Sequence, residues 1–237
     1  MRHFKGILLA LLAIAAACAV YLSVGYSPEP EARASLEGDS DVRVSRVDGV
    51  WRFDGPGETA GLVFYPGAKV DAVAYAPLMA SLARAGLDSY LPEVPLRLAL
   101  LGTSAARDIM GRYDHERWYL GGHSMGGVAA AMAAAARPEA VEGLILLGAY
   151  PDRDLPEEIK LLSVYGSRDA VLNRRRYEAA RAHWPPDARE VVIEGGNHSG
   201  FGDYGAQRGD QTPTIAPEAQ RAATVEAILD FCGIEAR

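Results

Sequence analysis

Apolar runs of strand length alternate with helical stretches along most of this 237-residue chain, and that alternation restricts its fold more than any other feature. Strands that are apolar throughout are buried on both faces, with helices packed above and below the sheet. The sequence therefore predicts an α/β fold with a mostly parallel sheet. The predicted strands are 61–65, 87–91, 117–120, 143–147, 161–165 and 190–193, and the predicted helices are 75–85, 104–113, 125–136, 174–182 and 218–231.

A period-two pattern marks the start of the domain. Residues 42–47 alternate apolar and polar side chains, and residues 50–53 follow after Asp48-Gly49, so we predict an antiparallel hairpin. We assign residues 42–237 to one domain, because a chain of this length with 49% hydrophobic residues can form one sizeable core.

The composition excludes several classes of function. Lys and Arg number 24 against 31 Asp and Glu, so the net charge of −7 argues against nucleic acid as a partner. The two cysteines, Cys18 and Cys232, lack the spacing of a metal or redox motif, and we expect no metal and no other cofactor. The residues before Cys18 weakly resemble the lipid-attachment box of bacterial lipoproteins, but the apolar residues after it argue against lipidation.

The first 25 residues indicate a targeting segment rather than part of the core. Arg2 and Lys5 precede residues 6–24, nineteen residues without a charge, which as a helix would span about 28 Å. The hydrocarbon layer of a bilayer is about 30 Å thick, so we predict a single-pass membrane anchor with the domain outside the cytoplasm. Ala17-Cys18-Ala19 also fits a signal-peptidase site, which leaves secretion after cleavage as the alternative.

The composition changes between this segment and the domain. Residues 26–41 carry Pro28, Pro30 and several glutamates with few apolar side chains. Such a stretch has little to bury and favours extended backbone, so we predict a short extended linker.

The segment Gly122-His123-Ser124-Met125-Gly126 carries the strongest chemical signal. It fits G-x-S-x-G and lies between the predicted strand 117–120 and the predicted helix 125–136, which is the context that the motif requires. The turn holds its serine in a strained conformation, and glycines on both sides leave room for it. We therefore predict that Ser124 is a nucleophile.

A serine nucleophile needs an adjacent base, and the base needs a third group that fixes its tautomer. The partners of this motif follow it in the order acid, histidine. Asp169 and His198 each follow a predicted strand, at the carboxyl ends where the sites of open α/β sheets assemble. We predict His198 as the base and Asp169 as the acid that orients it. Asp152 and Asp154, which follow the preceding strand, remain the alternative for the acid.

Two backbone N–H groups are expected to stabilise the negative oxygen that forms when the serine attacks a carbonyl group. One belongs to Met125, the residue after the nucleophile. The other comes from the loop after strand 61–65, where Pro66 has no N–H, so we predict Ala68. Lys69 in the same loop is a candidate for binding an acidic group of the substrate, and a solvated lysine is the alternative.

The segment 201–210, which follows the predicted base, is rich in glycine and polar side chains. It begins three residues after His198 and must lie beside the site. We predict that Asp203 or Tyr204 binds substrate or holds the loop of His198. A surface loop whose Asp and Gly residues only satisfy turns is the alternative.

With these residues in order, the span 42–231 resembles the α/β-hydrolase superfamily, specifically its compact dienelactone-hydrolase-like branch. Within that branch it is similar to a group of membrane-anchored bacterial hydrolases that share the stretches 65–70, 195–198 and 201–205. Dienelactone hydrolases proper use a cysteine where this chain has Ser124, so their substrate is not carried over. Many lipases and esterases have His-Gly where this chain has Pro66-Gly67, which leaves the second oxyanion donor open.

The resemblance implies a hydrolase without a cofactor. We expect an esterase or related acyl hydrolase that forms an acyl-enzyme with a small or amphiphilic ester at the outer face of the membrane. Residues 151–160 are too few for the helical lid that many relatives insert there, so an open pocket is expected. An acyltransferase with the same triad is one alternative. A membrane-tethered binding protein that has lost the chemistry is another, and the intact Ser124, Asp169 and His198 argue against it.

Overall fold

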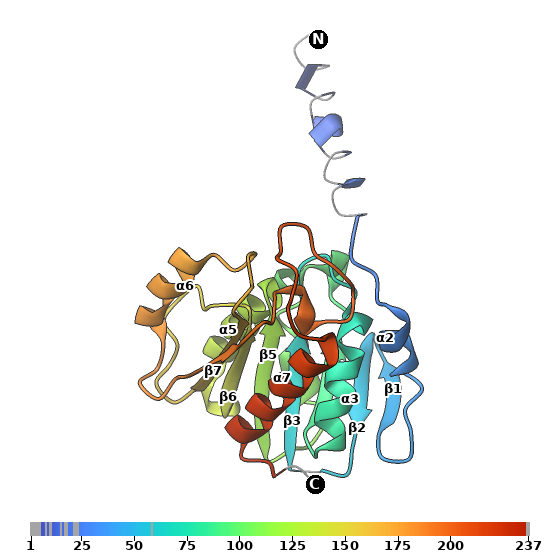
Figure 1. The fold of residues 1–237 in the computed structure, drawn as a ribbon, viewed down its shortest axis with the longest axis vertical. Helices are drawn as coiled ribbons and strands as arrows, with labels where there is room; N and C mark the ends of the chain where they lie inside the picture. Colours follow the sequence, from blue (N-terminus) through green and yellow to red (C-terminus); the bar gives the residue numbers. More distant parts are fainter. Residues whose placement is uncertain are drawn as a thin grey trace.

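The protein forms an eight-stranded sheet in the order β1-β2-β4-β3-β5-β6-β7-β8, covered by helices on both faces (Figure 1). The structure is a computed structural model that describes residues 24–57 and 59–235, together with residues 6, 7, 9, 11–14, 16, 19 and 20. The α/β fold predicted from the alternation of strands and helices is confirmed.

The sheet is parallel except at one edge. The hairpin of β1 and β2 joins β4 in an antiparallel manner, and all pairs from β4 to β8 are parallel. The parallel strands therefore end along one edge, where the loops that follow them meet. The strands are β1 (Arg43–Val47), β2 (Val50–Asp54), β3 (Ala60–Tyr65), β4 (Asp88–Pro92), β5 (Arg117–His123), β6 (Gly143–Leu147), β7 (Lys160–Gly166) and β8 (Arg189–Ile193).

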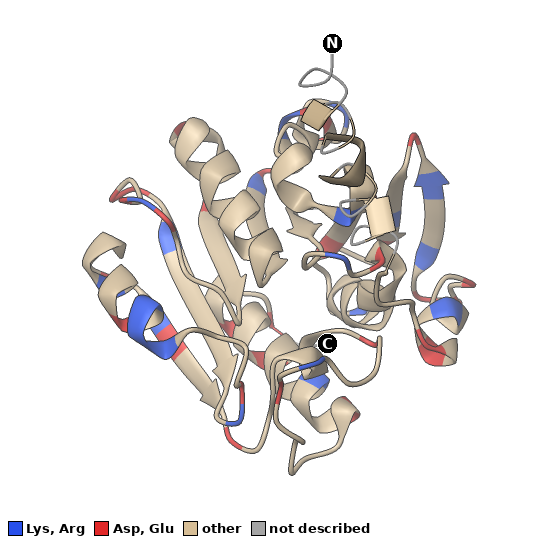
Figure 2. Cartoon of the chain, turned by 90° about the horizontal axis from the view of Figure 1, so that it is seen from above, with Lys and Arg blue, Asp and Glu red and all other residues tan. Residues whose placement is uncertain are grey.

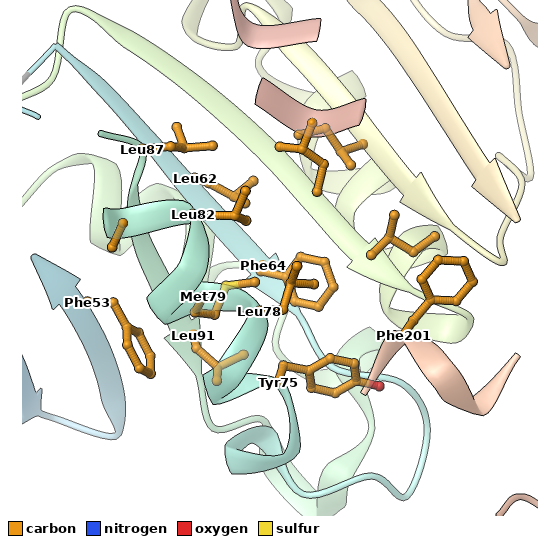
Figure 3. Close-up of a cluster of buried hydrophobic side chains, with 14 of the residues drawn as sticks. Phe53, Leu62, Phe64, Tyr75, Leu78, Met79, Leu82, Leu87, Leu91 and Phe201 are labelled. Carbon is orange, nitrogen blue, oxygen red and sulfur yellow. The ribbon is translucent and has the colours of Figure 1, made fainter. Parts of the chain in front are cut away.

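Two hydrophobic clusters fill the space between the sheet and its helices. One lies under α3 (Ala76–Arg84) and α7 (Pro217–Cys232) and contains large side chains such as Phe53, Phe64 and Tyr75 (Figure 3). The other lies on the opposite face, under α4 (Ala105–Met110) and α5 (Met125–Ala136). The remaining long helix, α6 (Arg174–Ala180), follows β7.

Helix α5 is built almost entirely from alanine and glycine, which lets it approach the sheet closely. A Cβ atom at Gly126 would lie 2.2 Å from the carbonyl oxygen of Tyr65 in β3, so only glycine fits there. The close approach at Gly126 fixes the start of α5, and with it the residue that precedes the helix. Helix α5 carries no charged residue, as a buried helix requires, whereas α6 is rich in charged residues (Figure 2).

No helix is inserted between β6 and β7, as predicted from the short segment 151–160. The bounds of most predicted elements agree with the structure to within two residues. The exceptions are the predicted helix 104–113, which is shorter as α4 and ends at Met110, and the predicted strand 117–120, which extends to His123 as β5.

The prediction of an extended linker at 26–41 is wrong for part of that segment. Residues Pro30–Ala34 form the short helix α2, and the side chain of Ala32 is fully buried. Tyr26 pairs with Val70 in a parallel bridge, so the chain is already packed on the domain well before the predicted start at Val42. The apolar and aromatic side chains that anchor this segment are too widely spaced to show a periodic pattern.

The predicted anchor at residues 1–25 falls largely outside the described residues. Among the residues that the structure does describe, no helix has the length and apolar character needed to cross a membrane.

Candidate active site

Ser124 lies in a sharp turn between β5 and α5, with a backbone φ of 54° and ψ of −123°. A positive φ is strained for a residue with a side chain, and here neighbouring glycines make it feasible. A Cβ atom at Gly122 would lie 2.4 Å from the backbone of Gly126, so a larger residue would push the turn apart. The N–H of Ser124 donates to the carbonyl of Leu147 at 2.9 Å, which ties the turn to β6. The turn thus has the geometry of the nucleophile elbow that G-x-S-x-G predicts.

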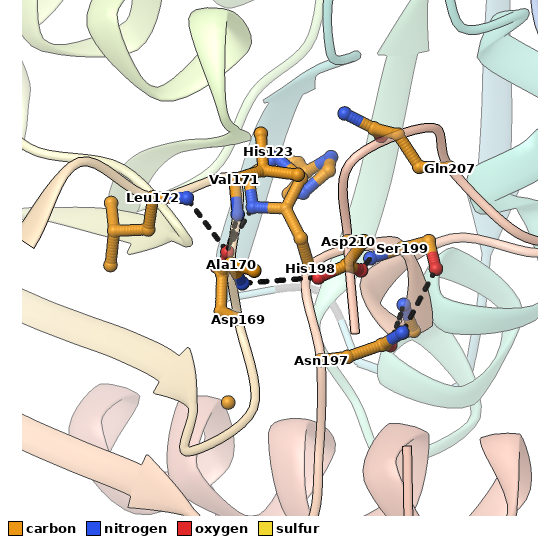
Figure 4. Close-up of polar contacts among 12 residues, drawn as sticks. His123, Asp169, Ala170, Val171, Leu172, Asn197, His198, Ser199, Gln207 and Asp210 are labelled. Carbon is orange, nitrogen blue, oxygen red and sulfur yellow. Dashed lines mark hydrogen bonds and ion pairs between the residues drawn. The ribbon is translucent and has the colours of Figure 1, made fainter. Parts of the chain in front are cut away.

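Asp169 and His198 lie in contact at the carboxyl ends of β7 and β8 (Figure 4). Oδ2 of Asp169 is 2.8 Å from Nδ1 of His198, and both side chains are almost fully buried. The other oxygen of Asp169 accepts from the N–H groups of Val171 and Leu172 at 3.0 and 2.8 Å. These bonds hold the carboxylate in one orientation, and the contact leaves Nε2 of the imidazole for other chemistry.

Nε2 of His198 is buried and has no hydrogen-bond partner within the described part of the chain. The hydroxyl of Ser124 is therefore not hydrogen-bonded to it in this structure. Such bonds are often long or absent in enzymes without substrate and tighten when it binds.

The alternative acids have other partners. The carboxylate of Asp152 pairs with Arg153 at 3.0 Å, and that of Asp154 lies 2.5 Å from Nδ1 of His183. Neither contacts His198, so the geometry favours Asp169 as the residue that orients this imidazole.

Asp210 and Gln220, which the sequence analysis did not single out, hold the loop of His198. The carboxylate of Asp210 accepts from the N–H of Ser199 at 2.9 Å and from that of Ala170 at 3.2 Å, so it links the two loops that carry Asp169 and His198. The buried amide of Gln220 in α7 accepts from the N–H of Asn197 and donates to its carbonyl, at 3.0 and 2.8 Å. No local sequence pattern identifies such partners, because they lie 11 to 40 residues from the groups that they bind.

Within the described residues, the two predicted oxyanion donors are not engaged in other hydrogen bonds. Neither the N–H of Ala68 nor that of Met125 donates to another residue that the structure describes. The N–H of Gly67, by contrast, donates to the hydroxyl of Tyr75 at 3.0 Å and is not available. This arrangement is compatible with the predicted assignment to Ala68 and Met125.

His123, the variable residue of the motif, is part of the site's support. Its Nδ1 lies 2.8 Å from the Tyr75 hydroxyl, and its ring packs against that of His198 with centroids 4.4 Å apart and an angle of 49° between the ring planes. Burial, together with the neighbouring His198, lowers the pKa of His123 well below its ordinary value. His123 is therefore neutral at physiological pH. Through Tyr75 it links the nucleophile turn to the loop of Gly67.

The predicted substrate residues lie in different surroundings. Lys69 is half-buried in the loop after β3 with a left-handed φ of 64°. Asp203 is half-buried beside α2, and burial raises the pKa of its carboxyl. The ring of Tyr204 packs against Tyr26 in the core, and its hydroxyl donates to Gln207 at 2.9 Å. Tyr204 thus has a packing role here, and the predicted contacts of all three with substrate remain predictions.

A family model matches residues 61–222, which is most of the domain. This span contains the turn that carries Ser124 and the pair of His198 and Asp169. The chain belongs to the alpha/beta hydrolase family. No curated protein matches the sequence.

Solved structures of alpha/beta hydrolases share the fold at low sequence identity. Mouse alpha/beta hydrolase domain-containing protein 10 is 14% identical, with a TM-score of 0.59 over 82% of this chain and 99% of that one. A dienelactone hydrolase from Anabaena variabilis is 19% identical, with a TM-score of 0.57 over 80% and 98%. An esterase from the bacterial hormone-sensitive lipase family is 17% identical, with a TM-score of 0.59 over 83% and 86%. At these identities the likeness concerns the fold alone.

Proposed function

We propose that this alpha/beta hydrolase is a serine esterase or related acyl hydrolase that works through an acyl-enzyme. The observation that carries the proposal is the buried pair of His198 and Asp169, 2.8 Å apart, beside an elbow that holds Ser124 at a positive φ. A serine in an elbow and a histidine oriented by a carboxylate are the parts that acyl transfer to water requires.

Each group has one role in this reaction. His198 takes the proton of Ser124 as the hydroxyl attacks the carbonyl carbon, and it later gives that proton to the leaving alcohol. Asp169 stabilises the imidazolium and keeps Nδ1 as a donor. The N–H groups of Met125 and Ala68 bind the oxygen that becomes negative. Water then cleaves the acyl-enzyme by the same steps, and no cofactor takes part.

We propose further that the protein is held at a membrane by residues 6–24, with its domain outside the cytoplasm. The support is the uncharged stretch of nineteen residues behind Arg2 and Lys5. Secretion after cleavage at Ala17-Cys18-Ala19 is the alternative, and fractionation of the full-length protein with membranes after carbonate washing distinguishes the two.

Labelling with a fluorophosphonate probe tests the chemistry. The probe forms a covalent bond with an activated serine, so we expect the full-length protein to be labelled at Ser124, and Ser124→Ala to lose both labelling and ester hydrolysis. Ser167→Ala is the control. Ser167 directly follows β7 and its hydroxyl accepts from the N–H of Gly195, so it is a serine outside the elbow, and we expect its replacement to retain labelling at Ser124. Equal labelling of the wild type and Ser124→Ala would refute the proposal.

A further inference from the structure

The chain that leaves the N-terminal segment is hydrogen-bonded directly to the loop after β3, residues 66–71, which we call the oxyanion loop because it contains the predicted donor Ala68. The N–H of Tyr26 donates to the carbonyl of Lys69 at 2.8 Å, and the N–H of Asp71 donates to the carbonyl of Tyr26 at 3.0 Å. The ring of Tyr26 also packs against Tyr204, in the loop that follows the base. Residue 26 is therefore fixed to both loops that border the site.

Val24 is the last residue of the uncharged stretch 6–24, so only Gly25 separates this stretch from Tyr26. If the stretch 6–24 is embedded in a bilayer, Tyr26 lies within two residues of it, which is at most about 7 Å of extended chain. Gly25 packs against Arg97, since a Cβ atom there would lie 2.4 Å from its guanidinium. The link between the stretch and the domain is therefore short and fixed. With the proposed anchor in the membrane, the loops that border the site lie at the surface of the bilayer.

The surface beside the oxyanion loop exposes apolar side chains. Val24, Leu96, Leu100 and Leu101 are 64%, 61%, 41% and 57% exposed. The three leucines lie in a segment of two short turns after β4, and the carbonyl of Arg97 in this segment accepts from the N–H of Lys69 at 2.8 Å. Within residues 24–235, the other large aliphatic side chains with such exposure are Val47 and Val192. Exposed apolar surface is therefore concentrated beside the oxyanion loop.

The backbone of this segment is strained in a way that exposes a leucine. Leu96 and Arg97 are consecutive residues with left-handed φ values of 55° and 56°, and neither is a glycine. Strain of this kind persists only where the surrounding structure enforces it, and it is concentrated at functional sites. Here it presents Leu96 to the outside next to a cavity of about 300 Å³ whose lining includes Pro66 of the oxyanion loop.

From these observations we propose that Val24, Leu96, Leu100 and Leu101, the apolar rim, insert into the bilayer interface, and that the substrate is an ester of a membrane lipid. The inference rests on the proposed esterase activity and on the proposed anchor. In the reaction, Ser124 takes the acyl group from the lipid, and the lipid alcohol leaves with the proton from His198. Water then releases the fatty acid and restores the serine, so no further reactant is needed.

The test compares two substrates with the full-length protein in phosphatidylcholine vesicles. One is a phosphatidylcholine that carries a fluorogenic acyl chain within the vesicle, and the other is the soluble ester p-nitrophenyl acetate. Replacing Leu96, Leu100 and Leu101 together by serine removes the apolar contact with the acyl region, so we expect the ratio of vesicle to soluble rates to fall by about tenfold or more. The control replaces Val47 and Val192, the exposed valines of the edge strands β1 and β8, together by serine, and we expect it to leave the ratio unchanged.

A second measurement does not depend on activity. Leu101→Trp adds a tryptophan at the apolar rim, and we expect brominated phosphatidylcholine to quench its fluorescence. Val192→Trp adds a tryptophan on β8, and we expect the brominated lipid not to quench it. An unchanged ratio in the triple variant, or equal quenching at both positions, overturns the proposal. If the wild type hydrolyses the soluble ester but not the vesicle lipid, the lipid substrate is refuted while the esterase stands. If Ser124 is not labelled and neither ester is cleaved, the proposed function itself fails.

Discussion

Asp169 was predicted as the acid from its place after a strand, and its contacts in the structure are compatible with that role. Its two oxygens serve different partners, because one accepts from two backbone N–H groups and the other lies against His198. The backbone bonds keep the carboxylate in place beside the imidazole. The position after a strand led to the prediction of Asp169 as the acid, and the contact with His198, which Asp152 and Asp154 lack, favours it over them.

Asp169→Asn tests that distinction. The amide would keep the backbone contacts on one oxygen but present the wrong group to Nδ1 of His198, so we expect turnover of a soluble ester to fall by up to about 10⁴-fold with little change in KM. Asp154→Asn is the control, and its turnover is expected to stay near that of the wild type. Loss of activity in the control with an active Asp169→Asn would move the acid to the loop after β6.

His123 makes the stability of the fold depend on pH. Its pKa is lowered in the folded state by burial and by His198, so the unfolded chain binds a proton at this residue over a pH range in which the folded chain does not. Stability from His123 is therefore present above the ordinary pKa of about 6.5 and is lost as the pH falls below it. We expect the free energy of unfolding in urea to decrease from pH 7.5 to pH 5, and to decrease less in His123→Asn. Parallel losses in the two proteins would show that His123 does not contribute.

At the scale of secondary structure, the sequence predicted the elements that are buried on both faces and missed what lies beside them. Helix α5 was predicted at its observed bounds, because its alanines have high helix propensity and its start is marked by the elbow. The segment of Leu96 has neither periodicity nor a turn signal that fixes left-handed backbone at two non-glycine residues. Its conformation is set by contacts with the oxyanion loop, which no local pattern encodes.

The loop of the base shows the same limit. His198 was predicted from the strand before it, but the side chains that hold its loop come from Asp210 and from Gln220 in α7. Asp203 or Tyr204 was predicted to bind substrate or to hold the loop of His198, because both lie close to His198 in the sequence. In the structure the ring of Tyr204 packs against Tyr26, from a segment about 180 residues earlier in the chain. Long-range pairs of this kind decide whether a polar aromatic residue faces a pocket or the core.

For the whole molecule, the main revision concerns where the domain begins. Residues 26–41 were assigned to a linker because they carry prolines and glutamates with few apolar side chains, yet this segment buries Ala32 and bonds to three other parts of the domain. The N–H of Glu29 donates to the carbonyl of Asp203 at 2.9 Å, and the carboxylate of Glu31 pairs with Arg221 in α7 at 2.6 Å. The segment therefore joins the loops around the site to the body of the domain.

Shortening the chain at three points separates the contributions of this segment. A protein that begins at Val24 retains Tyr26 and α2, and we expect it to hydrolyse a soluble ester as fast as the full-length chain. One that begins at Pro28 retains α2 but loses the bridge to Lys69 and Asp71, so the oxyanion loop is less well placed. A donor that is misplaced stabilises the transition state poorly, and we expect turnover to fall roughly tenfold.

A protein that begins at Val42 loses α2 as well, and should lose stability in addition to turnover. Each hydrogen bond lost costs about 1 kcal/mol, and about 1 kcal/mol corresponds to 2–4 °C of melting temperature in a domain of this size. The melting temperature of this shortest protein should therefore fall by several degrees relative to the one that begins at Val24, while that of the protein beginning at Pro28 falls less. Thermal unfolding and ester turnover of the three proteins provide the measurement. If the shortest protein matches the other two in both properties, residues 24–41 are a linker after all, and the bridge at Tyr26 does not position the oxyanion loop.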